Sequence, residues 1–103
     1  MQGRLSTFSY KRREYPTQTV DVRIVDCRNL PNPWSDPELR QLDGKDPRII
    51  AFLWKHDVEQ TNALINTGME LAQQGKHVYF GCYGGRHRSV AIAEMVRKLL
   101  EEQ

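Results

Sequence analysis

A short run near the C-terminus combines residue types that bind anions. It reads Cys82-Tyr83-Gly84-Gly85-Arg86-His87-Arg88-Ser89. An apolar segment precedes it and an amphipathic segment follows it, as expected for a strand, a loop and a helix. The first helical amides point outward unpaired, the helix dipole adds partial positive charge, and glycines let the backbone approach an oxygen closely. Arg86 and Arg88 add forked donors suited to phosphate. We expect an anion-binding loop; the alternative is an ordinary turn with solvated arginines.

The same run has the spacing of a catalytic cysteine loop. Cys82, Gly85, Arg88 and Ser89 form Cys-x2-Gly-x2-Arg-Ser, which resembles the phosphate-binding loop of cysteine-dependent protein tyrosine and dual-specificity phosphatases. In this alternative Cys82 is a thiolate nucleophile whose pKa Arg88 and the helix N-terminus lower, and Ser89 assists the leaving thiolate. Gly81 stands where those enzymes have histidine, and no aspartate lies in a recognisable general-acid loop. A buried, unreactive thiol at the end of a strand is the other interpretation of Cys82.

Residue patterning predicts an α/β fold that positions this loop. Strands are expected over 5–10, 20–27 and 77–82, from alternating or clustered apolar residues. Capping signals predict a short helix from Ser35 to Leu42, a second from Asp46-Pro47 to about His56, and a third from Asp57 to Gly75. An amphipathic helix is expected over 89–102.

Strands that are separated by helices usually pair in parallel. We therefore predict a small open, mostly parallel sheet with flanking helices, in which residues 78–100 form a phosphate-binding strand, loop and helix. Ligands of such sheets bind beyond the carboxyl ends of the strands, where both the 82–89 run and the segment after residue 26 are expected.

Composition limits the class of protein. The chain has 103 residues, 39% of them hydrophobic and 27% charged, so we expect one folded domain over residues 1–103. No apolar run approaches a membrane span and no signal peptide is recognisable, so a cytoplasmic location and no membrane partner are expected. The two cysteines suit neither a disulfide scaffold nor a metal site, and no cofactor is expected.

Two longer motifs extend over both expected strand ends. They are Asp26-Cys27-Arg28-Asn29-Leu30-Pro31-Asn32-Pro33 and Gly81-Cys82-Tyr83-Gly84-Gly85-Arg86-His87-Arg88-Ser89-Val90. Together they resemble the C-terminal domain of the RapZ family of RNase adapter proteins, also called YvcJ-like. The resemblance covers residues 8–100 and does not include that family's N-terminal ATP-binding domain, so we expect a stand-alone version of the C-terminal part. It implies a phosphosugar-sensing, possibly RNA-binding regulatory domain without chemistry of its own.

The resemblance also implies a ligand and the residues that bind it. In the family the pocket accepts glucosamine 6-phosphate. Carried over, Asp26 meets polar groups of the ligand, while its phosphate is held by the amides of Gly84 and Gly85 and by His87, Arg88 and Ser89. Arg28 is either a partner of Asp26 at the site or half of a structural ion pair. The sequence departs from the family motif at three ligand-facing positions, which are Trp34, Tyr83 and Arg86. We therefore expect that phosphate binding is kept and that the sugar specificity differs.

A basic segment near the N-terminus supports a possible RNA partner. Lys11, Arg12 and Arg13 lie between Tyr10 and Tyr15, and cations beside aromatic rings suit single-stranded RNA. A solvated loop is the alternative, and the family's basic C-terminal tail is missing, which weakens the expectation. A homo-oligomer, or a module that serves only oligomerisation, is a further expectation.

Overall fold

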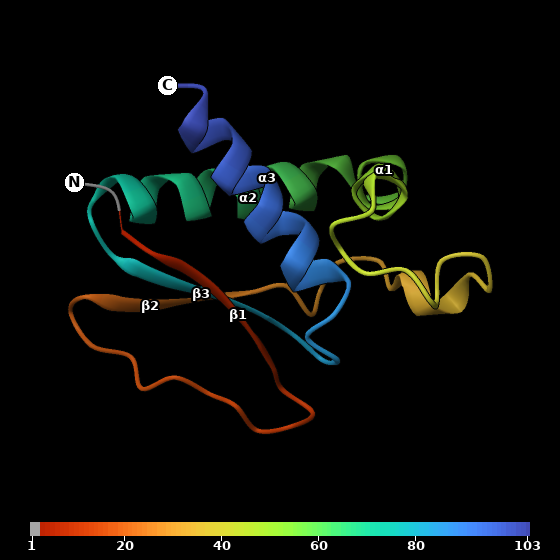
Figure 1. Cartoon of the computed structure of the whole chain (residues 1–103), viewed down its shortest axis with the longest axis horizontal. Coiled ribbons are helices and arrows are strands. Elements are labelled where there is room, and N and C mark those ends of the chain that lie inside the picture. Colours follow the sequence, from red (N-terminus) through yellow and green to blue (C-terminus); the bar gives the residue numbers. More distant parts are fainter. Residues whose placement is uncertain (1–2) are drawn as a thin grey trace.

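A parallel sheet of three strands forms the centre of the fold (Figure 1). In this computed structural model, which describes residues 3–103, β3 (His77–Cys82) lies between β1 (Leu5–Ser9) and β2 (Val22–Asp26) and pairs in parallel with both. This confirms the predicted open parallel sheet. Because both outer strands run parallel to the last strand in the sequence, all three strands end at the same edge of the sheet.

The helices α2 (Val58–Gln73) and α3 (Arg88–Glu101) cover one face of the sheet (Figure 1). A third helix, α1 (Pro47–His56), packs against both of them beside the sheet. Asp46 and Asp57 cap α1 and α2 as predicted, each accepting a hydrogen bond from a backbone amide of the first turn. Residues 10–21, which connect β1 to β2 without a helix, run past the opposite face of the sheet.

The helix predicted from Ser35 to Leu42 is wrong. A single 3-10 turn, η1 (Pro33–Ser35), is followed by successive turns, in which Asp36 accepts hydrogen bonds from the amides of Glu38, Leu39 and Arg40. Leu39 is the only buried residue from 36 to 42, so an α-helix there would have no apolar stripe to pack. Short helices gain most of their stability from such packing, and a capping signal alone does not supply it.

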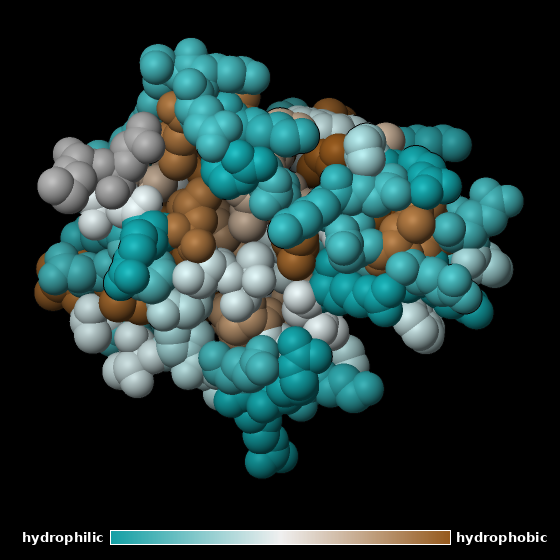
Figure 2. All heavy atoms as spheres, in the orientation of Figure 1, coloured by the Kyte–Doolittle hydropathy of each residue, from teal (hydrophilic) through white to brown (hydrophobic). Residues whose placement is uncertain are grey.

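The hydrophobic core lies between the helices and β3. Val78 and Phe80 of β3 are completely buried against apolar residues of all three helices, among them Ile49, Leu53, Ile65, Ala72, Ile92 and Val96. Gly68 lets α2 approach the sheet closely, because a Cβ atom there would lie 2.8 Å from the Phe80 ring. On the side of the molecule seen in Figure 2, hydrophobic residues reach the surface as separate small groups among hydrophilic ones. None of the helices within residues 3–103 has the length and apolar composition of a membrane span.

The Asp57 cap provides a test of how α2 is held. Oδ1 of Asp57 accepts from the amide of Gln60 at 3.0 Å, so Asp57→Ala leaves that amide without its partner. We expect a loss of about 1 kcal/mol in the free energy of unfolding, measured by urea denaturation followed by circular dichroism. Asp21→Ala removes an exposed carboxylate that caps no helix and is the charge-matched control. Equal losses in the two variants would contradict a capping role.

Candidate anion-binding site

Three chain segments meet at the edge where the strands end. Beyond the strands, the Cys27 amide donates to the carbonyl of Gly81 at 2.7 Å. On the other side of β3, the amides of Tyr10 and Lys11 donate to the carbonyls of Cys82 and Tyr83 at 3.0 and 2.8 Å. The segments that follow β1, β2 and β3 are therefore held side by side, as the rule for parallel sheets predicts.

The two loop glycines have different roles. Gly85 has a φ of +70°, and a Cβ atom there would lie 2.9 Å from Cβ of Ser9, so the turn requires glycine. The hydroxyl of Ser9 fixes the same turn by donating to the carbonyl of Tyr83 at 2.9 Å. Gly84 has no neighbour within 4 Å of its Cβ position and lies at the open side of the loop. Its backbone is therefore accessible to a ligand.

The absence of a side chain at Gly81 also has a structural reason. A Cβ atom at Gly81 would lie 2.3 Å from the Phe8 ring and 2.7 Å from the Tyr10 ring. The aromatic residues on the helix-free face thus exclude a larger side chain at this position, including the histidine of the phosphatase motif. Only the tertiary structure reveals this constraint, because Phe8 and Gly81 lie on different strands.

The second half of the loop is anchored to residues 40–44. The amide of Gly44 donates to the carbonyl of Arg86 at 2.8 Å, and the Arg86 guanidinium donates to the carbonyl of Gln41 at 2.6 Å. Nε2 of His87 donates to the carbonyl of Arg40 at 3.2 Å. The side chains of Arg86 and His87 therefore help to fold the loop as well as to line the cavity described next.

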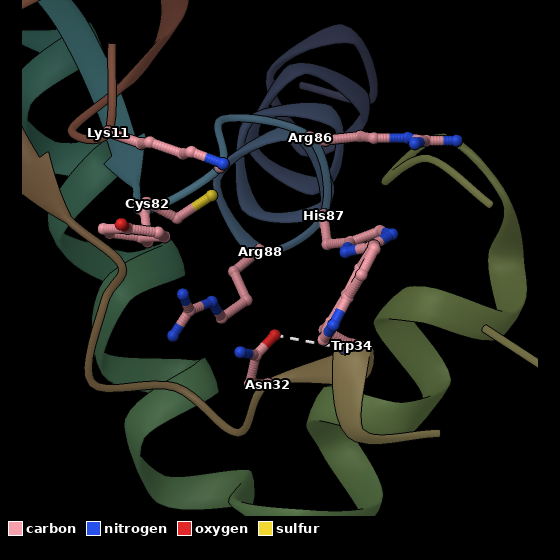
Figure 3. A pocket seen from close by; sticks show the side chains of 9 residues that line it. Lys11, Asn32, Trp34, Cys82, Arg86, His87 and Arg88 are labelled. Atoms are coloured by element: carbon pink, nitrogen blue, oxygen red, sulfur yellow. Dashed lines mark hydrogen bonds between the residues drawn. The ribbon is translucent and has the colours of Figure 1, made fainter. Parts of the chain in front are cut away.

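A cavity of about 400 Å³ lies in front of the loop. It is lined by Lys11, Asn32, Trp34, Cys82, Tyr83, Gly84, Arg86, His87 and Arg88. In Figure 3, Lys11 and Cys82 lie on one side of the cavity, Trp34 and His87 lie on the other, and Arg86 points away toward the segment that it anchors. The lining has three cationic residues and no carboxylate. Such a lining attracts anions and repels cations.

Arg88 joins this cavity to the segment that follows β2. Its side chain is only 7% exposed, and Nη1 donates to the carbonyls of Arg28 and Leu30 at 2.7 and 3.2 Å. Within residues 3–103, Nη1 is the only nitrogen of the Arg88 guanidinium that donates a hydrogen bond. The two carbonyls are neutral, so these bonds fix the Arg88 charge at the cavity without cancelling it. The same charge also acts on the nearby Asp26 carboxylate and helps to lower its pKa.

The two cysteines have opposite electrostatic environments. Burial alone would raise the pKa of Cys82, but hydrogen bonds from the hydroxyl and amide of Ser89 and from the amide of Gly85, with the charge of Arg88, bring the pKa below its usual value. Sγ of Cys82 lies 3.2 Å from Oγ of Ser89. In contrast, burial raises the pKa of Cys27, which is fully enclosed. Cys82 is therefore the more acidic thiol.

Asp26 and Arg28 pair with each other outside the cavity lining. The guanidinium of Arg28 donates to both carboxylate oxygens at 3.0 and 2.7 Å, and it also lies 3.6 Å from the centre of the Tyr10 ring. The hydrogen bond from Arg28 lowers the pKa of Asp26. This geometry favours the structural ion pair among the two interpretations of Arg28.

The structure distributes the other predicted site residues as follows. Trp34, Tyr83, Gly84, Arg86, His87 and Arg88 line the cavity, whereas Gly85 and the buried Ser89 are not part of its lining. Lys11, expected to bind RNA, also lines the cavity. Arg12 forms an exposed ion pair with Glu14, and Arg13 lies in the adjacent turn with a φ of +56°. Sequence reasoning missed Asn32 as a lining residue and Lys11 as a neighbour of the loop, because neither role has a local signal.

Comparisons with known proteins agree with the sequence motifs. The model of the RapZ C-terminal domain matches residues 1–103. A protein of Deinococcus radiodurans named nucleotide-binding protein is 36% identical over 107 residues, which cover 95% of this chain and 37% of that protein. Another of that name from Jannaschia is 38% identical over 112 residues, covering 100% of this chain and 34% of the relative. The chain thus spans about a third of the length of the curated relatives it matches.

Removal of the Ser89 hydroxyl tests the environment of the Cys82 thiol. Because the hydrogen bond from Ser89 lowers the pKa of Cys82, Ser89→Ala should raise that pKa and slow alkylation by iodoacetamide several-fold at about pH 8. Mass spectrometry of the digested protein separates the modification of Cys82 from that of Cys27. Thr7→Ala, which removes an exposed hydroxyl on β1, should leave the rate unchanged. An unchanged rate of Cys82 alkylation in Ser89→Ala would show that the Ser89 hydroxyl does not lower the pKa of the thiol.

Proposed function

The chain belongs to the RapZ C-terminal domain family, and from this premise we propose that its cavity binds a phosphorylated small molecule as a regulatory signal. The observation that carries the proposal is the cavity lining, which contains Lys11, Arg86 and Arg88 and no carboxylate. A phosphate monoester has a charge near −2 at neutral pH and three strong acceptor oxygens, which match these donors.

The cationic groups suit different parts of such a ligand. Arg88 is held in place by two backbone carbonyls, so little conformational freedom is lost when a phosphate binds its remaining donors. Lys11 has an exposed side chain that can follow the ligand as a mobile charge. The N-terminus of α3 begins at Arg88 and adds its partial positive charge.

Glucosamine 6-phosphate is the ligand that the family resemblance suggests first. The cavity volume of about 400 Å³ falls within the range of small-molecule sites, about 300–1,000 Å³. The relatives of this chain are named nucleotide-binding proteins, a name that also fits a phosphorylated ligand. We propose that the domain senses the ligand: the ligand-bound domain would regulate a partner molecule.

The alternative is a small cysteine-dependent phosphatase. The lowered pKa of Cys82 and its contact with Ser89 favour it. Against it, the described cavity lining offers no carboxylic acid to protonate a leaving group, and Cys82 is only 2% exposed. The binding proposal expects no hydrolysis of p-nitrophenyl phosphate by the reduced protein. Turnover that is abolished in Cys82→Ser would replace the binding proposal with the phosphatase.

RNA is a second candidate ligand, and the position of the 11–13 segment supports it. Lys11 lines the cavity, and Arg12, Arg13 and Tyr15 are all exposed close to it in the chain. RNA phosphates and a small phosphorylated ligand could therefore compete for one basic surface. Because Glu14 forms an ion pair with Arg12, we expect Lys11 and Arg13 to contribute more than Arg12 to the attraction of RNA phosphates.

Phosphate binding can be tested on individual amides. We expect millimolar inorganic phosphate or glucosamine 6-phosphate to shift the NMR signals of the Gly84, His87 and Ser89 amides. Lys11→Gln should weaken the apparent affinity roughly five- to tenfold, since one charged contact contributes about 1–1.5 kcal/mol. Lys55→Gln removes an exposed cation at the end of α1 and should change little. If neither ligand shifts the amide signals of the loop, the proposed function is wrong.

RNA binding can be tested by gel shift with single-stranded RNA at two salt concentrations. Replacing both Arg12 and Arg13 with Ala should weaken binding and reduce its salt dependence, because two phosphate contacts are removed. Lys55 and Lys98, both exposed on helices, provide a double variant with the same change in charge. If both double variants bind equally, the 11–13 segment does not contribute specifically.

A further inference from the structure

We propose that Trp34 stacks on a planar ring attached to the phosphate, so that the cavity accepts a nucleoside monophosphate unit. This inference rests on the proposed function, because it assigns the phosphate to Lys11, Arg88 and the start of α3. It adds a second recognition element on the opposite side of the cavity, where Trp34 lies in Figure 3.

Trp34 is exposed although its backbone is firmly held. Its side chain is 55% exposed. Its amide donates to Oδ1 of Asn32 at 3.1 Å, and its carbonyl accepts from Nε of Arg40 at 2.6 Å. A large apolar side chain kept in water by a fixed turn loses the free energy that burial would supply. A ligand ring in the cavity would recover part of that free energy.

The surroundings of the indole favour stacking on one face. The guanidinium of Arg40 lies over the indole at 5.6 Å from the ring centre. Arg40 therefore occupies one side of the ring, and the exposed remainder is available to the cavity that Trp34 lines. A nucleobase stacks on an exposed aromatic ring through its own π face, whatever its sequence identity.

The polar groups of the cavity offer few acceptors to a ligand that is recognised by its sugar hydroxyls alone. Hydroxyl groups of a sugar donate hydrogen bonds and need acceptors, which sites usually provide as carboxylates or amide oxygens. Among the described lining residues no carboxylate is present, and one of the two lone pairs of Oδ1 of Asn32 is used by the Trp34 amide. Asp26, the carboxylate expected from the family resemblance, is bound to Arg28. The π face of a base needs no acceptor, so stacking on Trp34 gives a nucleotide a contact that a sugar phosphate lacks.

A free mononucleotide and a nucleotide within single-stranded RNA present the same chemistry to this site. Both combine a phosphate with a stacking ring at the distance of one ribose. We assign the site to that shared unit, and the experiment separates the two sources.

The test compares ligands that differ by one group in isothermal titration calorimetry. The ligands are inorganic phosphate, ribose 5-phosphate, glucosamine 6-phosphate, adenosine 5′-monophosphate and single-stranded RNA of about six nucleotides. We expect the mononucleotide to bind roughly tenfold more tightly than ribose 5-phosphate. Trp34→Ala should remove this preference and leave the affinity for ribose 5-phosphate unchanged, whereas Trp34→Phe should keep most of the preference. Tyr15→Ala removes a similarly exposed ring (54%) that is not part of the cavity lining and is the matched control for the small ligands. It is not used as the control for the oligonucleotide, because Tyr15 lies beside the proposed RNA-binding segment.

The outcomes distinguish this inference from the proposed function. Equal affinity for the mononucleotide and ribose 5-phosphate, or a preference that survives in Trp34→Ala, overturns the inference while phosphate binding stands. Absence of binding by every phosphate ligand overturns the proposed function itself. Trp34-dependent binding that is much tighter for the oligonucleotide supports the inference and identifies RNA as the source; comparable affinities support it with the free mononucleotide as the source.

Discussion

The central position of β3 is the constraint on which the candidate site depends. Because β1 and β2 both pair in parallel with β3, the carboxyl ends of three strands from distant parts of the sequence reach one edge. The segments that follow are then bound by backbone hydrogen bonds, such as those from Cys27 to Gly81 and from Lys11 to Tyr83. The cavity is the space that these three segments enclose together with the start of α3.

The loop after β3 uses the same side chains for folding and for charge. Arg86, His87 and Arg88 each donate to backbone carbonyls of another segment, and those bonds fix the positions of the donors. Backbone carbonyls are neutral, so the bonds to them leave the charges of Arg86 and Arg88 in place, whereas carboxylates pair directly with Arg28 and Arg12. Fixed cationic donors suit anion binding, because the cost of ordering them is met when the protein folds.

The small net charge of +2 conceals an uneven distribution of acidic and basic residues. Residues 29–75 carry an excess of acidic groups, yet none of those carboxylates lines the cavity. The acidic side chains of Asp46 and Asp57 instead cap helices, while the cationic residues Lys11, Arg86 and Arg88 line the cavity. The chain belongs to the RapZ C-terminal domain family, and the curated relatives that it matches are about three times longer.

The sequence by itself determined the strands, the capped helices α1 and α2, the family and the loop motif after β3, because alternation, caps and a contiguous motif are local signals. It did not determine the turns at 36–42, which form because only Leu39 finds a core to pack into. The local pair of Asp26 and Arg28 was one of two interpretations of the sequence, and the structure favours it. The sequence did not determine that Lys11 and Trp34 line the same cavity as the loop. Those placements depend on strand order, and strand order is a property of long-range pairing that no local pattern encodes.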